Sequence, residues 1–144
     1  MLSATLTHPL PRPLPEQDAS RLFLFAVRRM GAHGLNDAHV AGAFMTNFGA
    51  GSRRPLIAMR VMMNEMAATA STPITIAPCC CARMTSAEAA LVDIISQIAH
   101  QPRTAHLLLA DLLGNRRVDG VLATMALVAS AFSDVGRPLD QPAG

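Results

Sequence analysis

The chain has 144 residues, of which 51% are hydrophobic and only 15% are charged, so most of its length has the composition of a folded domain and not of a disordered segment. The formal net charge is only +2 and the twelve basic residues, all arginine, are scattered along the chain, which argues against nucleic acid as a partner. Aromatic residues make up 3%, so the core must consist of aliphatic residues and methionine, which favours helices over strands.

Residues 1–16 carry four alternating prolines, and we expect them to form an extended, disordered arm. The start of the chain lacks the basic region and the continuous apolar region of a signal peptide. The longest apolar run, residues 121–132, is too short to span a membrane. We therefore expect no membrane span and a cytoplasmic protein with reduced cysteines.

Helix start and stop signals divide residues 17–140 into helices separated by short breaks. Asp18 can cap the first helix, Asn36 or Asp37 the second and Ser52 the third, after a break at residues 49–51. These signals predict a single-domain all-α bundle of five or six helices, with a short extended cysteine-bearing segment in the middle. The expected helices run from 19 to 33, from 36 or 37 to 48, from 52 past 66, from 85 to 100, up to 113, and from 117 to 133.

Apolar stripes indicate which helix faces are buried. In the first helix, Arg21, Arg28 and Arg29 are expected mostly outside the stripe. In the third, a row of methionines could be a soft metal or partner site, but unbranched methionine more often fills gaps in a core. The last helix is apolar nearly all round, which is typical of a central helix. The stripe residues are Leu22, Phe25, Ala26 and Met30 in the first helix, and Leu56, Met59, Met63 and Met66 in the third.

The clearest local signal is a capping box at Thr85 and Glu88, in which each side chain can accept a hydrogen bond from the other residue's backbone amide. It predicts the start of the helix that follows the cysteines. Before the cysteines, residues 72–78 are the one stretch with extended character, too short to define a sheet.

Two parts of the chain are related by an offset of 83 residues. The offset joins Gly31 to Gly114 and two Arg-Pro-Leu tripeptides that begin at Arg54 and Arg137. An internal duplication with a pseudo-two-fold arrangement is one interpretation, and chance similarity of helices rich in Ala and Leu is the other. The two helical hairpins would span about 19–56 and 102–139.

The three cysteines, Cys79, Cys80 and Cys81, are adjacent and are the only ones in the chain. If the backbone is extended here, Cys79 and Cys81 point to one side and Cys80 to the other. Cys81 lies nearest the helix start and close to Arg83, and both features favour a thiolate, as in reactive cysteines. Adjacent thiols could also form a strained disulfide in a redox sensor, whereas the plain alternative is burial of small hydrophobic side chains.

Other site chemistry has weaker support. The cysteine spacing differs from zinc and iron–sulfur motifs, and a metal site would need a tertiary contact between cysteines and histidines. No nucleophile elbow, phosphate-binding glycine loop or metal-binding helix motif is present, so the sequence assigns no catalytic residue and requires no cofactor. The candidate metal ligands are Cys79, Cys81, His100 and His106, and the candidate anion-binding residues at a helix start are Ser52, Arg53 and Arg54.

The run Ala77-Pro78-Cys79-Cys80-Cys81, followed by Arg83-Met84-Thr85 and by Glu88, resembles a family of small, Ala-rich proteins of unknown function from alphaproteobacteria. The resemblance covers about residues 20–140 and includes Gly-Arg-Pro-Leu at 136–139. It implies that the cysteine block is a family feature, and it carries no activity onto this chain.

The leading hypothesis is a small intracellular helical module that binds a protein partner or itself, with the cysteine cluster as its functional site. The high apolar fraction favours a homo-oligomer or a protein partner. The first alternative is a redox or sensor protein that depends on thiols or a metal ion, and the second is an enzyme of unknown class.

Overall fold

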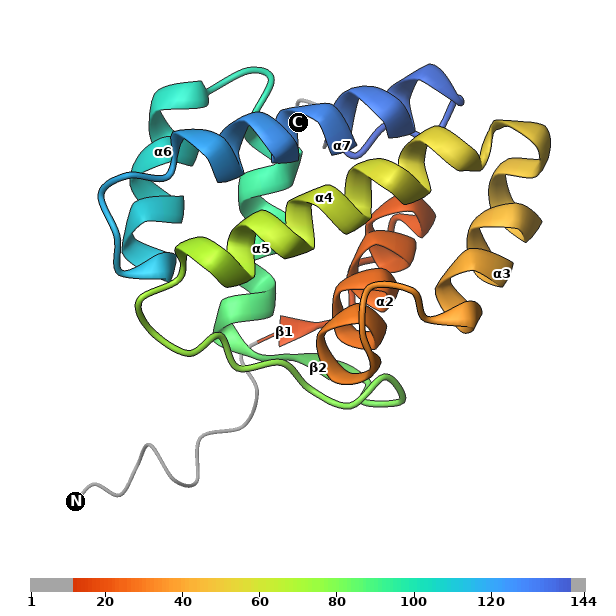
Figure 1. Ribbon diagram of the computed structural model, residues 1–144, viewed down its shortest axis with the longest axis horizontal. Helices are drawn as coiled ribbons and strands as arrows, with labels where there is room; N and C mark the ends of the chain where they lie inside the picture. Colours follow the sequence, from red (N-terminus) through yellow and green to blue (C-terminus); the bar gives the residue numbers. More distant parts are fainter. Residues whose placement is uncertain (1–11, 141–144) are drawn as a thin grey trace.

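The computed structural model describes residues 12–140, and helices dominate this part of the chain (Figure 1). It is 67% helical, with six α-helices and one small two-stranded sheet in the described range. The expected all-α fold of five or six helices is therefore confirmed, while residues 1–11 of the expected arm lie outside the described residues. The elements are β1 (Arg12–Pro13), α2 (Asp18–His33), α3 (Ala38–Phe48), the 3-10 turn η1 (Gly49–Gly51), α4 (Arg53–Thr69), β2 (Arg83–Met84), α5 (Ser86–Gln97), α6 (Pro102–Leu113) and α7 (Asp119–Asp134).

Most helix ends lie at the expected capping residues. Asp37 is the N-cap of α3, and its carboxylate accepts a hydrogen bond from the amide three residues later at 3.2 Å. Other boundaries differ from the prediction. The N-cap of α2 is Gln17 and not Asp18, which lies inside the first turn. The helix α5 ends at Gln97 and not near His100, and a turn over residues 98–100 leads to the proline that begins α6.

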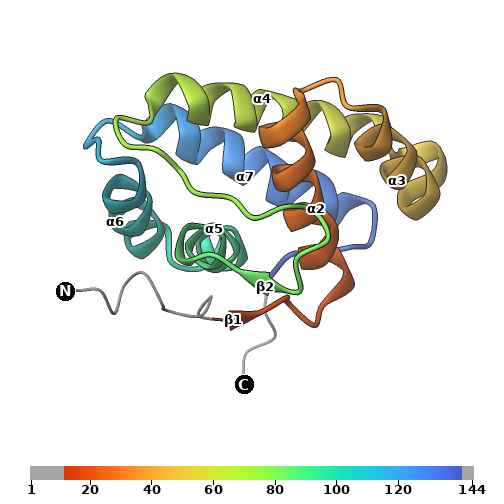
Figure 2. The same cartoon turned by 90° about the horizontal axis from the view of Figure 1, so that it is seen from below.

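The helices α4 and α7 lie side by side and form the largest helix pair of the described chain (Figures 1 and 2). They are antiparallel, since Arg54 at the start of α4 forms an ion pair with Asp134 at the end of α7. The helix α5 and the β1–β2 ribbon lie on the other side of the molecule from the α4–α7 pair. The helix α2 runs between these two sides (Figure 2). Among the helices of residues 12–140, none covers the other face of the α4–α7 pair (Figure 2).

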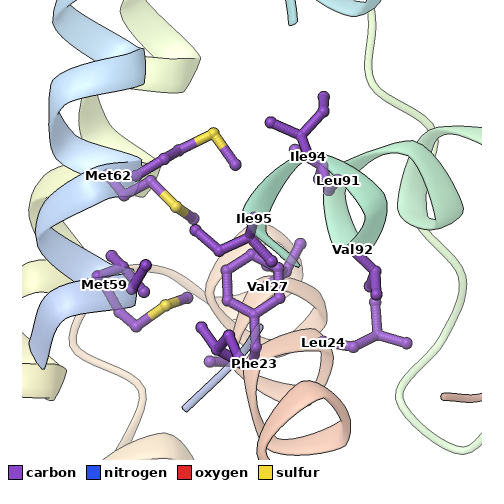
Figure 3. Packing of buried hydrophobic residues seen from close by; sticks show 14 of the residues in the cluster. Phe23, Leu24, Val27, Met59, Met62, Leu91, Val92, Ile94 and Ile95 are labelled. Carbon is purple, nitrogen blue, oxygen red and sulfur yellow. The ribbon is translucent and has the colours of Figure 1, made fainter. Parts of the chain in front are cut away.

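The core lies between α2, α4, α5 and α7 and consists mainly of aliphatic side chains and methionines. Met59 and Met62 of α4 reach toward Phe23 of α2 and Ile95 of α5, and all four are fully buried (Figure 3). The methionines thus fill the gaps between three helices, as unbranched side chains can. Met63, which was expected in the buried stripe, is only half-buried because the buried face of α4 is centred closer to Met62.

The connection from α4 to α5 crosses α2 and α6 before it reaches the cysteines. Near its start, the amide of Ser71 donates to the carbonyl of Leu113 at 2.8 Å. Further on, Ile76 passes so close to α2 that a Cβ on Gly31 would lie 2.5 Å from its Cδ1 atom. The extended stretch at residues 72–78 therefore packs against helices and forms no strand within the described structure.

The two strands hold the backbone that follows the cysteines. β1 pairs antiparallel with β2, with Arg12 opposite Met84. Beside this pair, the amide of Leu14 donates to the carbonyl of Ala82 at 3.2 Å, and the Arg12 guanidinium forms an ion pair with Asp93 at 2.9 Å. The chain on the C-terminal side of the cysteines is thus fixed to both β1 and α5.

The last helix, α7, is not enclosed as its sequence predicted. It packs on α4, α5 and α6, but Leu127 and its neighbours face solvent. None of the helices described between residues 12 and 140 is long and apolar enough to cross a membrane. Helices occupy both halves of the possible duplication, and the duplication itself stays a prediction.

Candidate functional site

The three cysteines lie on a β-turn between the long connection and α5. The amide of Cys81 donates to the carbonyl of Pro78 at 3.0 Å, which closes a four-residue turn with Cys79 and Cys80 at its centre. The extended backbone on which the alternation of the three side chains depended is therefore not present, because the chain reverses at the cysteines. We call residues 78–81 the cysteine turn.

The thiols of the cysteine turn are accessible and not part of the core. Cys79 and Cys80 are exposed, Cys81 is half-buried, and all three are free cysteines. Simple burial of small hydrophobic residues therefore does not explain why the chain places them here.

A buried ion pair lies directly beneath the cysteine turn. Arg28 of α2 and Glu88 of α5 face each other with two hydrogen bonds of 2.8 and 2.9 Å between guanidinium and carboxylate. Their side chains are only 2% and 0% exposed. Arg28 was expected on the outer side of its helix, but the buried face of α2 also contains Leu24, one turn earlier, and this position brings Arg28 inside.

Both members of the pair also hold the backbone around the cysteines. The Arg28 guanidinium donates to the carbonyls of Cys81 and Arg83, each at 2.8 Å. The Glu88 carboxylate accepts from the amides of Ala77 and Thr85, each at 2.9 Å. The pair thus fixes the chain before and after the cysteine turn, and no buried side-chain nitrogen or oxygen among residues 12–140 lacks a partner.

The capping box at the start of α5 is confirmed, and it supplies half of this arrangement. The Thr85 hydroxyl accepts from the Glu88 amide at 3.0 Å, while the Glu88 carboxylate accepts from the Thr85 amide. The same hydroxyl donates to the carbonyl of Thr75 at 2.7 Å. Glu88 therefore serves both as a helix cap and as the buried partner of Arg28, a second role that its local motif did not reveal.

The electrostatics of the pair favour two charged side chains. Burial alone raises the pKa of the Glu88 carboxyl, but the hydrogen bonds from Arg28, Ala77 and Thr85 outweigh burial and lower that pKa below its usual value. The pKa of Arg28 is raised, chiefly by its hydrogen bond to Glu88 and against the effect of burial. A buried ion pair adds little net stability compared with apolar residues, and its better-supported use is to specify one geometry.

Arg29, the next residue of α2, joins the cysteine turn to the start of α3. Its guanidinium donates to both carboxylate oxygens of Asp37, at 2.9 and 3.1 Å, and lies 2.9 Å from Nδ1 of His39. The pKa of Arg29 is raised, first by the hydrogen bond to Asp37 and further by the neighbouring sulfur of Cys79. Arg28, Arg29 and Cys79 line one hollow, so the Cys79 thiol lies near two guanidinium groups.

The Asp37 carboxylate should make the stability of the fold depend on pH in the acid range. The hydrogen bond from Arg29 is the main cause that lowers the pKa of Asp37 from 3.8 to about 2. Because the folded pKa is depressed, this contribution to stability is fully present above the unfolded value and is lost as the pH falls toward about 2. Asp37→Asn keeps a good N-cap residue but removes the charge.

We therefore expect Asp37→Asn to unfold at a lower temperature than the wild type at neutral pH, and the difference to shrink between about pH 4 and pH 2. Thermal unfolding followed by circular dichroism over this pH range measures the difference. An equal difference at neutral and acid pH would mean that the Asp37 charge is not responsible.

Two hollows flank Cys79. One, of about 350 Å³, lies between the cysteine turn and the N-terminal half of α2 and includes Asp18, Arg21 and Phe25. The other, of about 380 Å³, lies on the side of Arg29 and His33 and also includes Cys80. Cys79 lines both hollows, so a small molecule can approach its sulfur from either side.

The candidate metal ligands are not brought together. The cysteines precede α5, whereas His100 lies beyond its other end, where it contacts Asp140 at 2.9 Å. His106 lies on α6 and is 3.4 Å from Asp119. Within residues 12–140, no three His, Cys, Asp or Glu side chains form a group that could hold a metal ion.

The candidate anion site at the start of α4 is also incomplete. Ser52 is the N-cap residue, but its backbone is helical and its side chain makes no capping hydrogen bond. Arg54 forms an ion pair with Asp134, and Arg53 and Arg54 both line an apolar groove. Ser52 is not among the residues that line this groove, so an anion site of all three residues stays a prediction.

The fold and the site together define a small all-helical protein that displays an accessible cysteine turn above a buried arginine–glutamate pair. Residues 2–131 match the family of unknown function DUF6628, and the chain belongs to that family. The matched range includes the cysteine turn and both residues of the buried pair. Searches of the curated proteins and of the solved structures found no match.

Proposed function

We propose that the protein is a thiol-based redox switch in which the cysteine turn is the reactive group. The observation that supports the proposal is the combination of accessible thiols with a backbone that a buried ion pair fixes from below. A solvent-exposed turn needs no buried charges for stability, whereas a reactive group benefits from a fixed geometry. The proposal implies thiols that are reduced at rest, as in the cytoplasm.

Cys79 is the proposed attacking residue. It is exposed, it lines both hollows, and Arg28 and Arg29 line one of these hollows with it. Reactive cysteines occupy accessible and electropositive surroundings of this kind. Cys81, which the sequence favoured, is half-buried with its carbonyl bound to Arg28, and it suits the role of the resolving thiol.

The proposed oxidant is a low-molecular-weight disulfide, R–S–S–R. The Cys79 thiolate attacks one of its sulfurs, forms a mixed disulfide and releases R–S⁻. The Cys81 thiolate then attacks the Cys79 sulfur and releases the second R–S⁻. Two protein thiols are oxidised to one disulfide, R–S–S–R is reduced to two R–SH, and the two thiol protons end on the released thiols.

The pairing of Cys79 with Cys81 follows from chain geometry. Adjacent Cα atoms across a trans peptide are about 3.8 Å apart, below the range of about 4.4–6.8 Å found for disulfides. The structure has no cis peptide bond in its described part. A bond between neighbouring cysteines is therefore strained, while Cys79 and Cys81, separated by one residue in a turn, can reach the normal range.

Oxidation of the cysteines should change the packing of the core helices through Arg28. The disulfide would tighten the cysteine turn and displace the carbonyl of Cys81, which accepts a hydrogen bond from Arg28. Arg28 belongs to α2 and its partner Glu88 to α5, so a change at the turn reaches the contact between two core helices. Through these contacts, oxidation of the thiols can change how α2 packs against α5.

The test is to treat the reduced protein with oxidised glutathione, block the remaining thiols with iodoacetamide and locate the blocked residues by mass spectrometry. We expect the wild type to lose two hydrogens and to be alkylated only at Cys80. Cys80→Ser is the matched control and should still form the disulfide. Cys79→Ser and Cys81→Ser should stop at mixed disulfides or remain reduced.

The result that would overturn the proposal is a wild-type protein in which all three thiols stay free, or in which the cysteines react equally and independently of one another.

The second candidate function is a binding or self-associating module. The observation that favours it is a group of large apolar side chains exposed on α4 and α7.

A further inference from the structure

An apolar groove lies on the uncovered face of the α4–α7 pair, on helices other than α2 and α5, which hold the cysteine turn. Ile57 and Val61 of α4 are 46% and 43% exposed, and Leu127 of α7 is 52% exposed. Together with the start of α4 they line a groove of about 400 Å³. Three large apolar side chains at one place mark an interaction surface more clearly than the same residues scattered singly.

One ridge of α4 has a self-complementary charge pattern, with Glu65 half-buried and its carboxylate beside Gly120 at the start of α7. Arg53, Ile57, Val61 and Glu65 follow one another at intervals of four residues and form one ridge on the helix surface. The ridge has a cation at one end, an anion at the other and two apolar residues between them. Neither Arg53 nor Glu65 has an ion-pair partner in the described structure, whereas Arg54, beside Arg53, is paired with Asp134.

We propose that this face binds a second copy of the chain and forms a two-fold symmetric dimer. In an antiparallel arrangement of two α4 ridges, Arg53 of one copy faces the partner's Glu65 at each end, and Ile57 faces the partner's Val61 in the middle. Position 59 lies midway in sequence between 53 and 65, and also midway between 57 and 61. A single two-fold axis at the level of this position therefore relates all four contacts. Such an interface is isologous, with the same patch on both copies.

Helix geometry favours this pairing. Ridges formed by residues four apart pack against each other at a crossing angle of about 50°, the commonest class of helix packing. The partner's ridge would occupy the groove beside α4, with Leu127 of α7 as the opposite wall. The ends of the ridge carry opposite charges, so a parallel arrangement would place like charges together.

The symmetric pattern also selects a second copy over a different partner. The other strongly exposed apolar residues, Met45 on α3 and the pair Leu107 and Leu108 on α6, lie on other helices and are not among the residues that line this groove. A partner of other chemistry would need to match both charged ends by its own sequence. A second copy matches them by symmetry alone.

The test uses charge reversal at the two ends of the ridge. Sedimentation and light scattering of the full chain, under excess reductant, measure the dimer dissociation constant from micromolar to submillimolar concentration. Reductant prevents any contribution of intermolecular disulfides, so the result is independent of the proposed thiol switch. We expect Arg53→Glu and Glu65→Arg each to weaken the wild-type dimer by about tenfold or more.

The double variant R53E/E65R should recover the dimer, because the swapped charges again face each other. A mixture of the two single variants should form a heterodimer, detectable by native mass spectrometry, although each variant alone dissociates. Leu107→Gln on α6 is the matched control at another exposed leucine and should leave the dimer unchanged. A wild-type monomer at every concentration, or a double variant as weak as the singles, would overturn the proposal.

Discussion

Replacement of Glu88 by alanine is expected to lower the free energy of unfolding by about 3–5 kcal/mol, because it leaves the Arg28 guanidinium charged and unpaired in the core. The loss extends beyond the ion pair. The amides of Ala77 and Thr85 would lose the carboxylate that accepts their hydrogen bonds. Urea unfolding followed by circular dichroism measures the change, and a shift of the transition to much lower urea is the expected result.

A surface ion pair provides the matched control. Arg12 and Asp93 form a similar charged contact, 2.9 Å long, but Arg12 is exposed and Asp93 is only half-buried. Arg12→Ala should therefore cost less than about 1 kcal/mol. If Glu88→Ala and Arg12→Ala had equal effects, the buried pair would not have the role that the structure assigns to it.

The double variant Arg28→Met/Glu88→Leu distinguishes two explanations of why Glu88→Ala lowers the free energy of unfolding. In some proteins apolar residues replace a buried ion pair without loss. Here the pair also binds backbone groups of Ala77, Cys81 and Arg83, which methionine and leucine cannot do. We therefore expect the double variant to stay destabilised, with the cysteine turn more accessible to alkylation. Recovery to wild-type stability would mean that charge burial, and not backbone fixation, dominates.

Local sequence signals predicted the helices because helices are built from local contacts. Asp37, Thr85 and Gly114 lie at helix ends for reasons that act within four residues of each one. The capping box even identified one of the two residues that hold the site, Glu88. Predictions of this kind needed no knowledge of the tertiary fold.

The remaining part of the site depends on contacts between distant residues. Arg28 and Glu88 are 60 residues apart, and nothing near Arg28 distinguishes it from Arg21 or Arg29 except its spacing of four residues from the buried Leu24. Pro78 favours an extended backbone in the residue before it, but this extended state does not continue through the cysteines. The turn hydrogen bond from Cys81 then reverses the chain.

Phe132→Ala is the second change with a large expected effect, a loss of about 3–5 kcal/mol of unfolding free energy. The Phe132 ring of α7 meets the rings of Phe44 and Phe48 of α3 edge to face, with centroids 5.8 and 5.2 Å apart. Within α3 only Val40 and Phe44 are buried. This aromatic cluster therefore attaches α3 to α7, in addition to the contacts of α3 with α2 and α4.

The Phe132 variant should consequently loosen α3 before it unfolds the whole chain. We expect amide hydrogen exchange to accelerate more in α3 than in α5, whose buried face is far larger. Phe25→Ala, at a half-buried ring of α2, is the matched control and should leave α3 protected. Uniform acceleration in all helices would contradict this expectation. Because Asp37 caps α3 and binds Arg29 beside Cys79, a loosened α3 should also change the alkylation rate of Cys79, which connects the aromatic cluster to the thiol site.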